Sequence, residues 1–392
     1  MNLKKKLVAT GVAFGLALGA AVAAVPAANA DVTVNGYSAV GSDTLQDVLN
    51  ALTNGSALSG SNVRVTAGGS SVGSFDAFGS TVIQTKAFGP YFPRPGGSGA
   101  GVNALIASIQ NVAYNGSAPI GNQVDIARSS GAAGANADTS GDLVYVPFGR
   151  DALGYAYLVD PAWSTADKNA FATLTAAQLT AIYNGTQTTV GGQTVHPRLP
   201  QTASGTRQTF LTKIGFASNA TPSTVPAADN TTGGPAENDA RVLTTPGEII
   251  PFSAAQWISQ FNGAAAINTT GAANVSYGNA DGVAPFTLSS GKLTPNSAYY
   301  NSNWGRDTFL VVEYAKVTPV LPGTSTANPR YDAKLAALVN PSGAGQSSLV
   351  TSGAAPTTPG GLKRVFGFLA PSSTTPVRAY PNVYPDSVWP GN

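Results

Sequence analysis

Two short stretches of the chain combine hydroxyl groups with unhindered backbone N–H groups, the donors that hold a small oxyanion. They are residues 95–101, with the sequence PGGSGAG, and residues 203–207, with the sequence ASGTR. Each stretch precedes a helix-like segment, and the first turn of a helix presents free N–H donors at the positive end of the helix dipole. The pattern therefore indicates anion binding rather than bond-making chemistry.

The second stretch has the richer set of donors. Phosphate has four oxygens, so a site without water must supply many donors but need not supply full positive charge. Ser204 and Thr206 offer hydroxyls, and Gly205 lets the backbone approach a ligand closely. Arg207 offers a bidentate guanidinium. The structural alternative is that Ser204 only caps the helix and that Arg207 faces solvent.

The chain lacks the residues that most classes of enzyme use for catalysis. His196 is the only histidine, and it lies at the end of a predicted strand, where we expect a structural role. The chain has no cysteine, residues 136–142 resemble a calcium loop only faintly, and no Lys-Ser/Thr follows the Gly-rich stretch as a P-loop requires. We expect neither enzymatic activity nor a bound metal or cofactor. Hydrolysis by a carboxylate pair stays open, because such pairs meet only in three dimensions.

Residues 1–30 have the pattern of a cleaved signal peptide. Three lysines at positions 4–6 precede an apolar run at 7–25, and Ala28-Asn29-Ala30 forms a small-residue cleavage site. The alternative, an uncleaved membrane anchor, fits the small-residue end less well. No later stretch approaches the ~18 to 20 apolar residues of a membrane span, and there is no lipobox cysteine. We expect a secreted or periplasmic protein that begins at Asp31, without stable membrane insertion.

Composition limits the remaining possibilities. Charged residues make up 10% of the chain, against the roughly 25% of ordinary soluble proteins, and the net charge is only +2. Nucleic acid is therefore not an expected partner. The hydrophobic fraction of 43% excludes a disordered chain. The length after residue 30 suits two domains.

Strand-like and helix-like segments alternate, which is typical of an α/β fold. Expected strands are 33–40, 63–67, 124–127, 143–147, 152–159 and 308–312, and expected helices are 44–52, 102–109, 175–183 and 204–214. Thr175 is a candidate N-cap for the third helix. Polar stretches rich in Gly, Pro and Asn predict surface loops at 131–141, 218–239 and 341–361.

The order of the motifs resembles the phosphate-binding proteins of ABC phosphate importers, in the type II periplasmic-binding-protein superfamily. The matching pieces are Gly41-Ser42-Asp43-Thr44, residues 97–101, 124–130, 146–148 and 174–185, and Ser204-Gly205-Thr206-Arg207. The resemblance implies two α/β lobes that close by a hinge around ligand. Lobe one would comprise 31–148 plus 316–392, lobe two 149–315, and the crossovers would lie near 149–156 and 309–314.

The resemblance also implies a function and a site. The protein would be a monomeric solute-binding protein that captures inorganic phosphate between its lobes and delivers it to an ABC permease. The implied ligand-binding residues are Ser42, Asp43, Thr44, Ser98, Gly99, Arg128, Ser129, Ser130, Ser204, Gly205, Thr206 and Arg207.

The chain departs from the family at two positions. Pro200 stands where members commonly carry an arginine, and Arg207 or Arg128 are the candidates to replace its charge. Ser130 stands where members carry the aspartate that accepts the proton of hydrogen phosphate, and Asp43 is the candidate substitute. Two alternatives therefore stay open: a binder of another oxyanion such as sulfate or molybdate, and an extracellular surface protein that kept the fold without transport.

Overall fold

The computed structural model describes residues 33–340, 349–350 and 352–384. The predicted signal peptide at 1–30 and part of the predicted loop at 341–361 lie outside these residues. Within them, no helix is both long enough and apolar enough to cross a membrane. The same residues contain no group of three or more His, Cys, Asp or Glu side chains placed to hold a metal ion.

The protein has an α/β fold, as the sequence predicts. A mixed nine-stranded sheet forms its centre. Its main path runs β2-β1-β5-β14-β6-β10-β9, and β11 and β15 also pair with β6. The strands are β1 (Tyr37–Gly41), β2 (Val72–Ser74), β5 (Ile126–Ser129), β6 (Leu143–Leu158), β9 (His196–Pro197), β10 (Glu248–Ser253), β11 (Val275–Tyr277), β14 (Gly305–Glu313) and β15 (Val377–Ala379).

Helices and short hairpins flank this sheet. The helices are α1 (Gln46–Asn54), α2 (Ser98–Gln110), α3 (Thr165–Ala172), α4 (Ala176–Tyr183), α5 (Gly205–Lys213), α6 (Ala254–Phe261), α7 (Ser297–Tyr300), α8 (Tyr314–Val317), α9 (Ala333–Val339) and α10 (Pro359–Val365). The hairpins are β3 (Val82–Ile83) with β4 (Phe92–Pro93), β7 (Thr189–Val190) with β8 (Gln193–Thr194), and β12 (Phe286–Ser289) with β13 (Lys292–Pro295).

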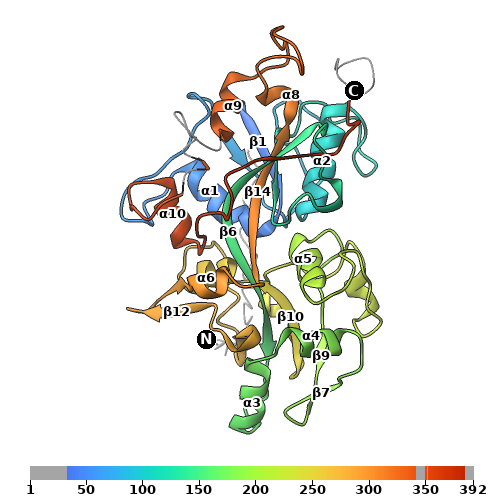
Figure 1. The fold of residues 1–392 in the computed structure, drawn as a ribbon, viewed down its shortest axis with the longest axis vertical. Coiled ribbons are helices and arrows are strands. Elements are labelled where there is room, and N and C mark those ends of the chain that lie inside the picture. The colour runs from blue at the N-terminus through green and yellow to red at the C-terminus, as the bar shows by residue number, and fades with distance from the viewer. Residues whose placement is uncertain (1–32, 341–348, 351, 385–392) are drawn as a thin grey trace, which may run out of the picture. The chain divides into compact units, whose positions relative to one another are not determined.

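Two long antiparallel strands, β6 and β14, connect the hydrophobic cores (Figure 1). One core consists of buried residues between Ala152 and Trp304. Two others draw mostly on residues 37–148 and 309–383. β6 carries buried residues of all three cores, and β14 carries Leu310 and Val312 of the second core and Phe309 and Val311 of the third. The lobe boundaries themselves stay predictions.

Several predicted elements differ from the structure. The expected strands at 143–147 and 152–159 form one strand, β6, because Arg150 and Asp151 are accommodated by partners on β14. The expected strand at 63–67 is wrong. Val63 makes only an isolated bridge to Ser56, since β2 already occupies the edge of β1. The predicted cap at Thr175 is confirmed as a full capping box with Gln178.

Candidate functional site

Predicted site residues from four segments meet beside the start of α5. Asp43 and Thr44 follow β1 in a 3-10 turn, Ser98 begins α2, Ser130 follows β5, and Ser204-Gly205-Thr206 begins α5. The hydroxyls form two pairs, Thr44 Oγ1 with Thr206 Oγ1 at 3.4 Å and Ser98 Oγ with Ser130 Oγ at 3.1 Å. We call Ser42, Thr44, Ser98, Ser130, Ser204 and Thr206 the hydroxyl cluster.

These segments pack so closely that position 205 requires a glycine. A Cβ at this position would lie 2.3 Å from Ser98 Oγ and 2.6 Å from Ser130 Oγ, closer than real Cβ atoms come. Ser204 accepts from the N–H of Arg207 at 3.1 Å and so caps α5. The first-turn N–H groups of α5, which have no partner within the helix, therefore lie directly against the hydroxyl cluster.

Arg306 is the cation of the cluster, and sequence analysis missed it. Its side chain is buried, and Nε and Nη2 donate to Asp151 Oδ2 at 3.0 and 2.8 Å. Nη2 also donates to Thr44 Oγ1 at 3.2 Å and to Thr206 Oγ1 at 3.0 Å. Within the described part of the chain, its Nη1 has no hydrogen-bond partner. A buried guanidinium nitrogen without an acceptor is costly, which makes it a candidate ligand contact.

A repeated Arg-Asp dipeptide is the signal that locates this cation. Arg150-Asp151 lies in β6 and Arg306-Asp307 lies in β14, and the antiparallel register places Arg306 opposite Asp151 and Arg150 opposite Asp307. Successive residues of a strand point to opposite faces. One ion pair therefore lies in the hydroxyl cluster, while Arg150 and Asp307 pair at 2.9 Å outside it.

Two further polar residues reach the cluster from the predicted surface loop at 218–239. Glu237 is 1% exposed. Its Oε2 accepts from the hydroxyl of Ser204 and from the N–H of Thr206 at 3.2 Å, and its Oε1 accepts from the N–H of Asp43 at 3.3 Å. Asn238 donates to Asp43 Oδ2 at 3.0 Å and to Thr44 Oγ1 at 3.3 Å. The expectation of a surface loop is therefore wrong at its end.

The charge of Glu237 influences the protonation of Asp43. Burial, followed by the charge of Glu237, raises the pKa of Asp43 well above its usual range. A protonated Asp43 can donate a hydrogen bond as well as accept one. Ser42 is fully buried, and its hydroxyl, like Nη1 of Arg306, has no partner among the residues that the structure describes.

Both arginines that we considered as the replacement cation direct their hydrogen-bond donors away from the hydroxyl cluster. Arg128 is buried, and its guanidinium donates to backbone carbonyls and one serine hydroxyl: Ser42 O at 3.0 Å, Ala39 O at 3.3 Å, Gly41 O at 3.1 Å, Phe75 O at 2.7 Å and Ser74 Oγ at 2.8 Å. Burial lowers the pKa of Arg128 to about 10, so it stays charged at neutral pH. Its role here is to order the turn after β1.

Arg207 is likewise engaged elsewhere. It is 1% exposed, which also excludes the solvent-facing alternative. Its guanidinium donates to four oxygens of the neighbouring loops: Pro200 O at 3.0 Å, Asp229 O at 2.9 Å, Ala220 O at 2.9 Å and Asn230 Oδ1 at 2.6 Å. The positive charge of Arg207 therefore supports the loops around α5 rather than a ligand.

Ser129 and Gly99 also have structural contacts. The Ser129 hydroxyl donates to Gly131 O at 2.7 Å, away from the cluster. The Gly99 N–H donates to Ala203 O at 3.3 Å and so joins α2 to the loop that begins α5. Of the predicted site residues, the structure brings together Ser42, Asp43, Thr44, Ser98, Ser130, Ser204, Gly205 and Thr206.

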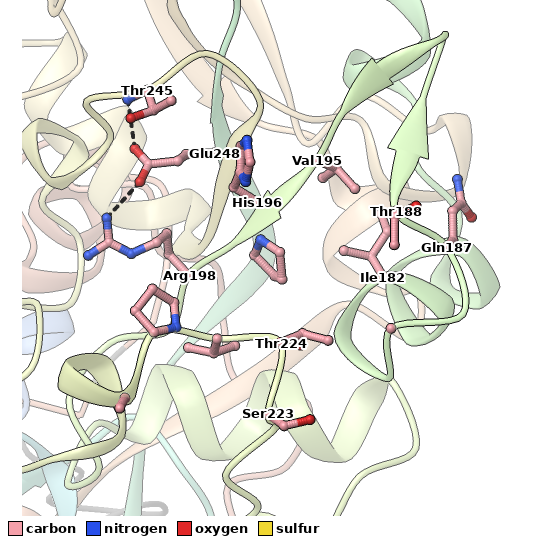
Figure 2. A pocket seen from close by; sticks show the side chains of 15 residues that line it. Ile182, Gln187, Thr188, Val195, His196, Arg198, Ser223, Thr224, Thr245 and Glu248 are labelled. Atoms are coloured by element: carbon pink, nitrogen blue, oxygen red, sulfur yellow. Dashed lines mark hydrogen bonds and ion pairs between the residues drawn. The ribbon is translucent and has the colours of Figure 1, made fainter.

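A cavity of about 690 Å³ lies elsewhere, between the end of α4, β9 and the loop at 223–227 (Figure 2). Its charged groups are already paired. Arg198 bonds Glu248 at 2.8 Å and Asp229 at 2.7 Å, and Glu248 accepts from the N–H of Thr245 at 2.9 Å. His196, in β9, lines the wall of this cavity. Its backbone N–H donates to Gly247 O at 2.9 Å. The hydroxyl cluster is the better candidate site.

Comparison with known proteins agrees with this architecture. The family model described as "PBP superfamily domain" matches residues 26–314, more than half of the chain. The chain therefore belongs to the PBP superfamily, whose members have a two-lobed α/β fold. A search among curated proteins found no match.

Among solved structures, the chain is similar to an ABC-type phosphate transport receptor from Vibrio cholerae, with 15% identity over 86% of this chain and 100% of that one, at a TM-score of 0.46. It is similar to a phosphate-binding protein from Stenotrophomonas maltophilia, with 13% identity over 87% and 92% and a TM-score of 0.46. It is also similar to a human phosphate-binding apolipoprotein, with 13% identity over 80% and 96% and a TM-score of 0.40.

Proposed function

We propose that this member of the PBP superfamily is an exported solute-binding protein that captures inorganic phosphate at the hydroxyl cluster, for ABC-type import. The observation that carries the proposal is Nη1 of Arg306, a buried cationic donor without a partner in the described residues, set among hydroxyls from several segments. Those segments are the ones whose motifs resemble phosphate importers' binding proteins. The protein would act without catalysis, as a binder.

The charges of the cluster suit a ligand held mainly by hydrogen bonds. Asp151 neutralises Arg306 at 2.8 Å, so the pair contributes no net charge, yet the guanidinium still offers Nη1 to a ligand oxygen. Hydroxyls of Ser42, Thr206 and Ser98 add donors that turn to suit the ligand. Hydrogen bonds to a charged group are worth about 1.5–3 kcal/mol each. Several of them compensate the dehydration of an oxyanion.

Arg306 supports the binding of an oxyanion because it can replace a missing arginine. Pro200 occupies the position where the resemblance implies an arginine, and Arg306 reaches the start of α5 from β14 instead. Asp43 is the candidate for the family's proton acceptor, but its raised pKa favours the protonated form, which donates a hydrogen bond instead. A protonated Asp43 donates equally to sulfate, however, so the identity of the anion is decided by titration.

Isothermal titration with phosphate and then sulfate at neutral pH tests the proposal. A charge-neutral double variant, Arg306→Gln/Asp151→Asn, removes the donor without leaving a buried charge unpaired. Its matched control is Arg150→Gln/Asp307→Asn, which makes the same exchange one residue along the same ladder. We expect phosphate binding to weaken by about 10- to 100-fold in the first variant only. Absence of binding to either anion in the unaltered protein contradicts the proposal.

A further inference from the structure

We propose that Glu237 is a tethered competitor of the captured anion: its carboxylate occupies the donors at the start of α5, and phosphate binds only when Glu237 withdraws. The inference rests on the proposed function, because it concerns the same site. It assigns Glu237 as a residue that sets the affinity of the site.

The contacts of Glu237 are those of a bound oxyanion. One carboxylate oxygen accepts from the Ser204 hydroxyl and the Thr206 N–H, which are the capping hydroxyl and a first-turn donor of α5. The other oxygen accepts from the N–H of Asp43, which opens the turn after β1. Thr44 and Thr206, which belong to these two segments, lie 162 residues apart in the chain. The carboxylate therefore bridges the same two segments that a phosphate would have to bridge.

Charge prevents Glu237 and a phosphate dianion from sharing these donors. Arg306 is already neutralised by Asp151, and the structure shows no ion pair between a described cation and Glu237. A dianion beside an ionised Glu237 would place like charges within a few ångströms in a buried site, where their repulsion is far stronger than in water. The free energy is lower when one anion leaves.

The connection that carries Glu237 allows such a withdrawal. It runs between two 3-10 turns, Ala227–Asn230 and Ala240–Val242, and residues 231–233 are exposed to solvent. Backbone bonds hold its first half at Thr231 O, which accepts from Thr202 N at 3.1 Å and from Gly234 N at 3.3 Å, and at Pro235 O, which accepts from Gln201 N at 2.9 Å. Its end is held at Asn238, whose O accepts from Gln260 Nε2 at 2.8 Å and whose Oδ1 accepts from Ser253 N at 2.9 Å. Rotation in residues 231–237 of this strap (residues 231–239), with Asn238 as its fixed end, would carry the carboxylate into water, where its charge is well solvated.

With competition of this kind, the apparent affinity equals the affinity of the open site multiplied by the fraction of time that the site is open. If Glu237 occupies the donors about 90% of the time, phosphate binds about tenfold more weakly than to the open site. Removing the charge of Glu237 should therefore tighten phosphate binding. A residue that helps to hold the ligand would give the opposite result, a loss of affinity.

Calorimetric titration with phosphate and with sulfate compares the unaltered protein with Glu237→Gln. The matched control is Asp239→Asn, which removes one negative charge two residues along the same strap, where Asp239 pairs with the exposed Arg241. We expect Glu237→Gln to bind phosphate at least about tenfold more tightly, and Asp239→Asn to bind like the unaltered protein. Equal or weaker binding by Glu237→Gln overturns the inference and leaves the proposed function standing.

Hydrogen exchange on the unaltered protein gives a second test that does not depend on the folding of a variant. Saturating phosphate should speed amide exchange in residues 231–237, because this part of the strap leaves the cluster, while exchange around Thr206 slows. Unchanged or slower exchange in the strap overturns the inference. If neither the unaltered protein nor Glu237→Gln binds phosphate or sulfate, the proposed function fails and the inference fails with it.

Discussion

Arg306 on β14 and Asp151 on β6 face each other across an antiparallel ladder, and Arg306 Nη2 lies 2.8 Å from Asp151 Oδ2. Both side chains are buried. Because the same nitrogen also reaches the hydroxyls of Thr44 and Thr206, this ion pair connects the central sheet to the turns after β1 and before α5. It fixes where a ligand would meet the guanidinium donor Nη1.

The single variant Arg306→Gln should be more destabilising than the double variant with Asp151→Asn. The single change leaves the Asp151 carboxylate buried without its partner, which costs about 3–5 kcal/mol. The double change restores a neutral polar pair and should recover most of that loss. Urea unfolding of the two single variants and the double variant measures the coupling. Additive effects would show that the two residues do not interact.

Replacing Gly205 by alanine should abolish anion binding. The added Cβ would lie 2.3 Å from Ser98 Oγ and would push α2 or the turn after β5 away from α5. Gly271→Ala is the control, because its Cβ would have no heavy atom within 4 Å and the residue lies outside the strap. Phosphate titration of both variants checks the prediction, and normal binding by Gly205→Ala would show that the ligand site does not need these contacts.

Thr206→Val should weaken phosphate binding by about tenfold, since it removes one hydroxyl donor and keeps the shape of the side chain. Thr180→Val is a suitable control. The Thr180 hydroxyl bonds only the carbonyls of Ala176 and Ile214, in α4 and after α5, away from the cluster. Titration calorimetry compares the two variants. Equal effects in both would mean that the loss arises from general destabilisation rather than from a ligand contact.

Lys363 should make folding stability depend on pH between neutral and alkaline conditions. Burial lowers the pKa of Lys363 to about 7, although Nζ donates to Phe148 O at 2.7 Å. The unfolded chain then binds more protons than the folded one between pH 7 and the usual lysine pKa near 10.5. Stability therefore rises with pH in this window, by up to about 1.4 kcal/mol per pH unit.

The variant Lys363→Met isolates this effect. Its unfolding free energy, measured by urea denaturation from pH 7 to 10, should rise less steeply with pH than that of the unaltered protein. At neutral pH the variant should be the more stable of the two, because it avoids the burial of an amine. Parallel pH profiles would show that Lys363 keeps its ordinary pKa in the folded state.

Local patterns predicted the elements of this fold well. The α/β alternation, the start of α5 at Ser204 and the cap at Thr175 depend on neighbours in sequence, and the structure confirms them. The expected strand at 63–67 failed because edge positions in a sheet are assigned by competition: β2 pairs with β1, and Val65 N donates to Leu52 O instead.

The charged residues of the site could not be predicted in the same way. Arg306 and Asp151 meet through the register of β6 and β14, which the sequence suggests only through the repeated Arg-Asp dipeptide. Glu237 reaches Asp43 across 194 residues of chain, and a loop-like composition gives no sign of that contact. Arg128 and Arg207 looked equally suitable, but burial directs their donors to loop carbonyls.

A crystal structure of the protein grown with phosphate tests the central claim most directly. We predict a phosphate oxygen within hydrogen-bonding distance of Arg306 Nη1 and of the hydroxyls of Ser42 and Thr206, with Glu237 turned toward solvent. Phosphate bound in the cavity beside Arg198 and Glu248, or an unchanged Glu237 in a cluster without phosphate at saturating concentration, would contradict the account.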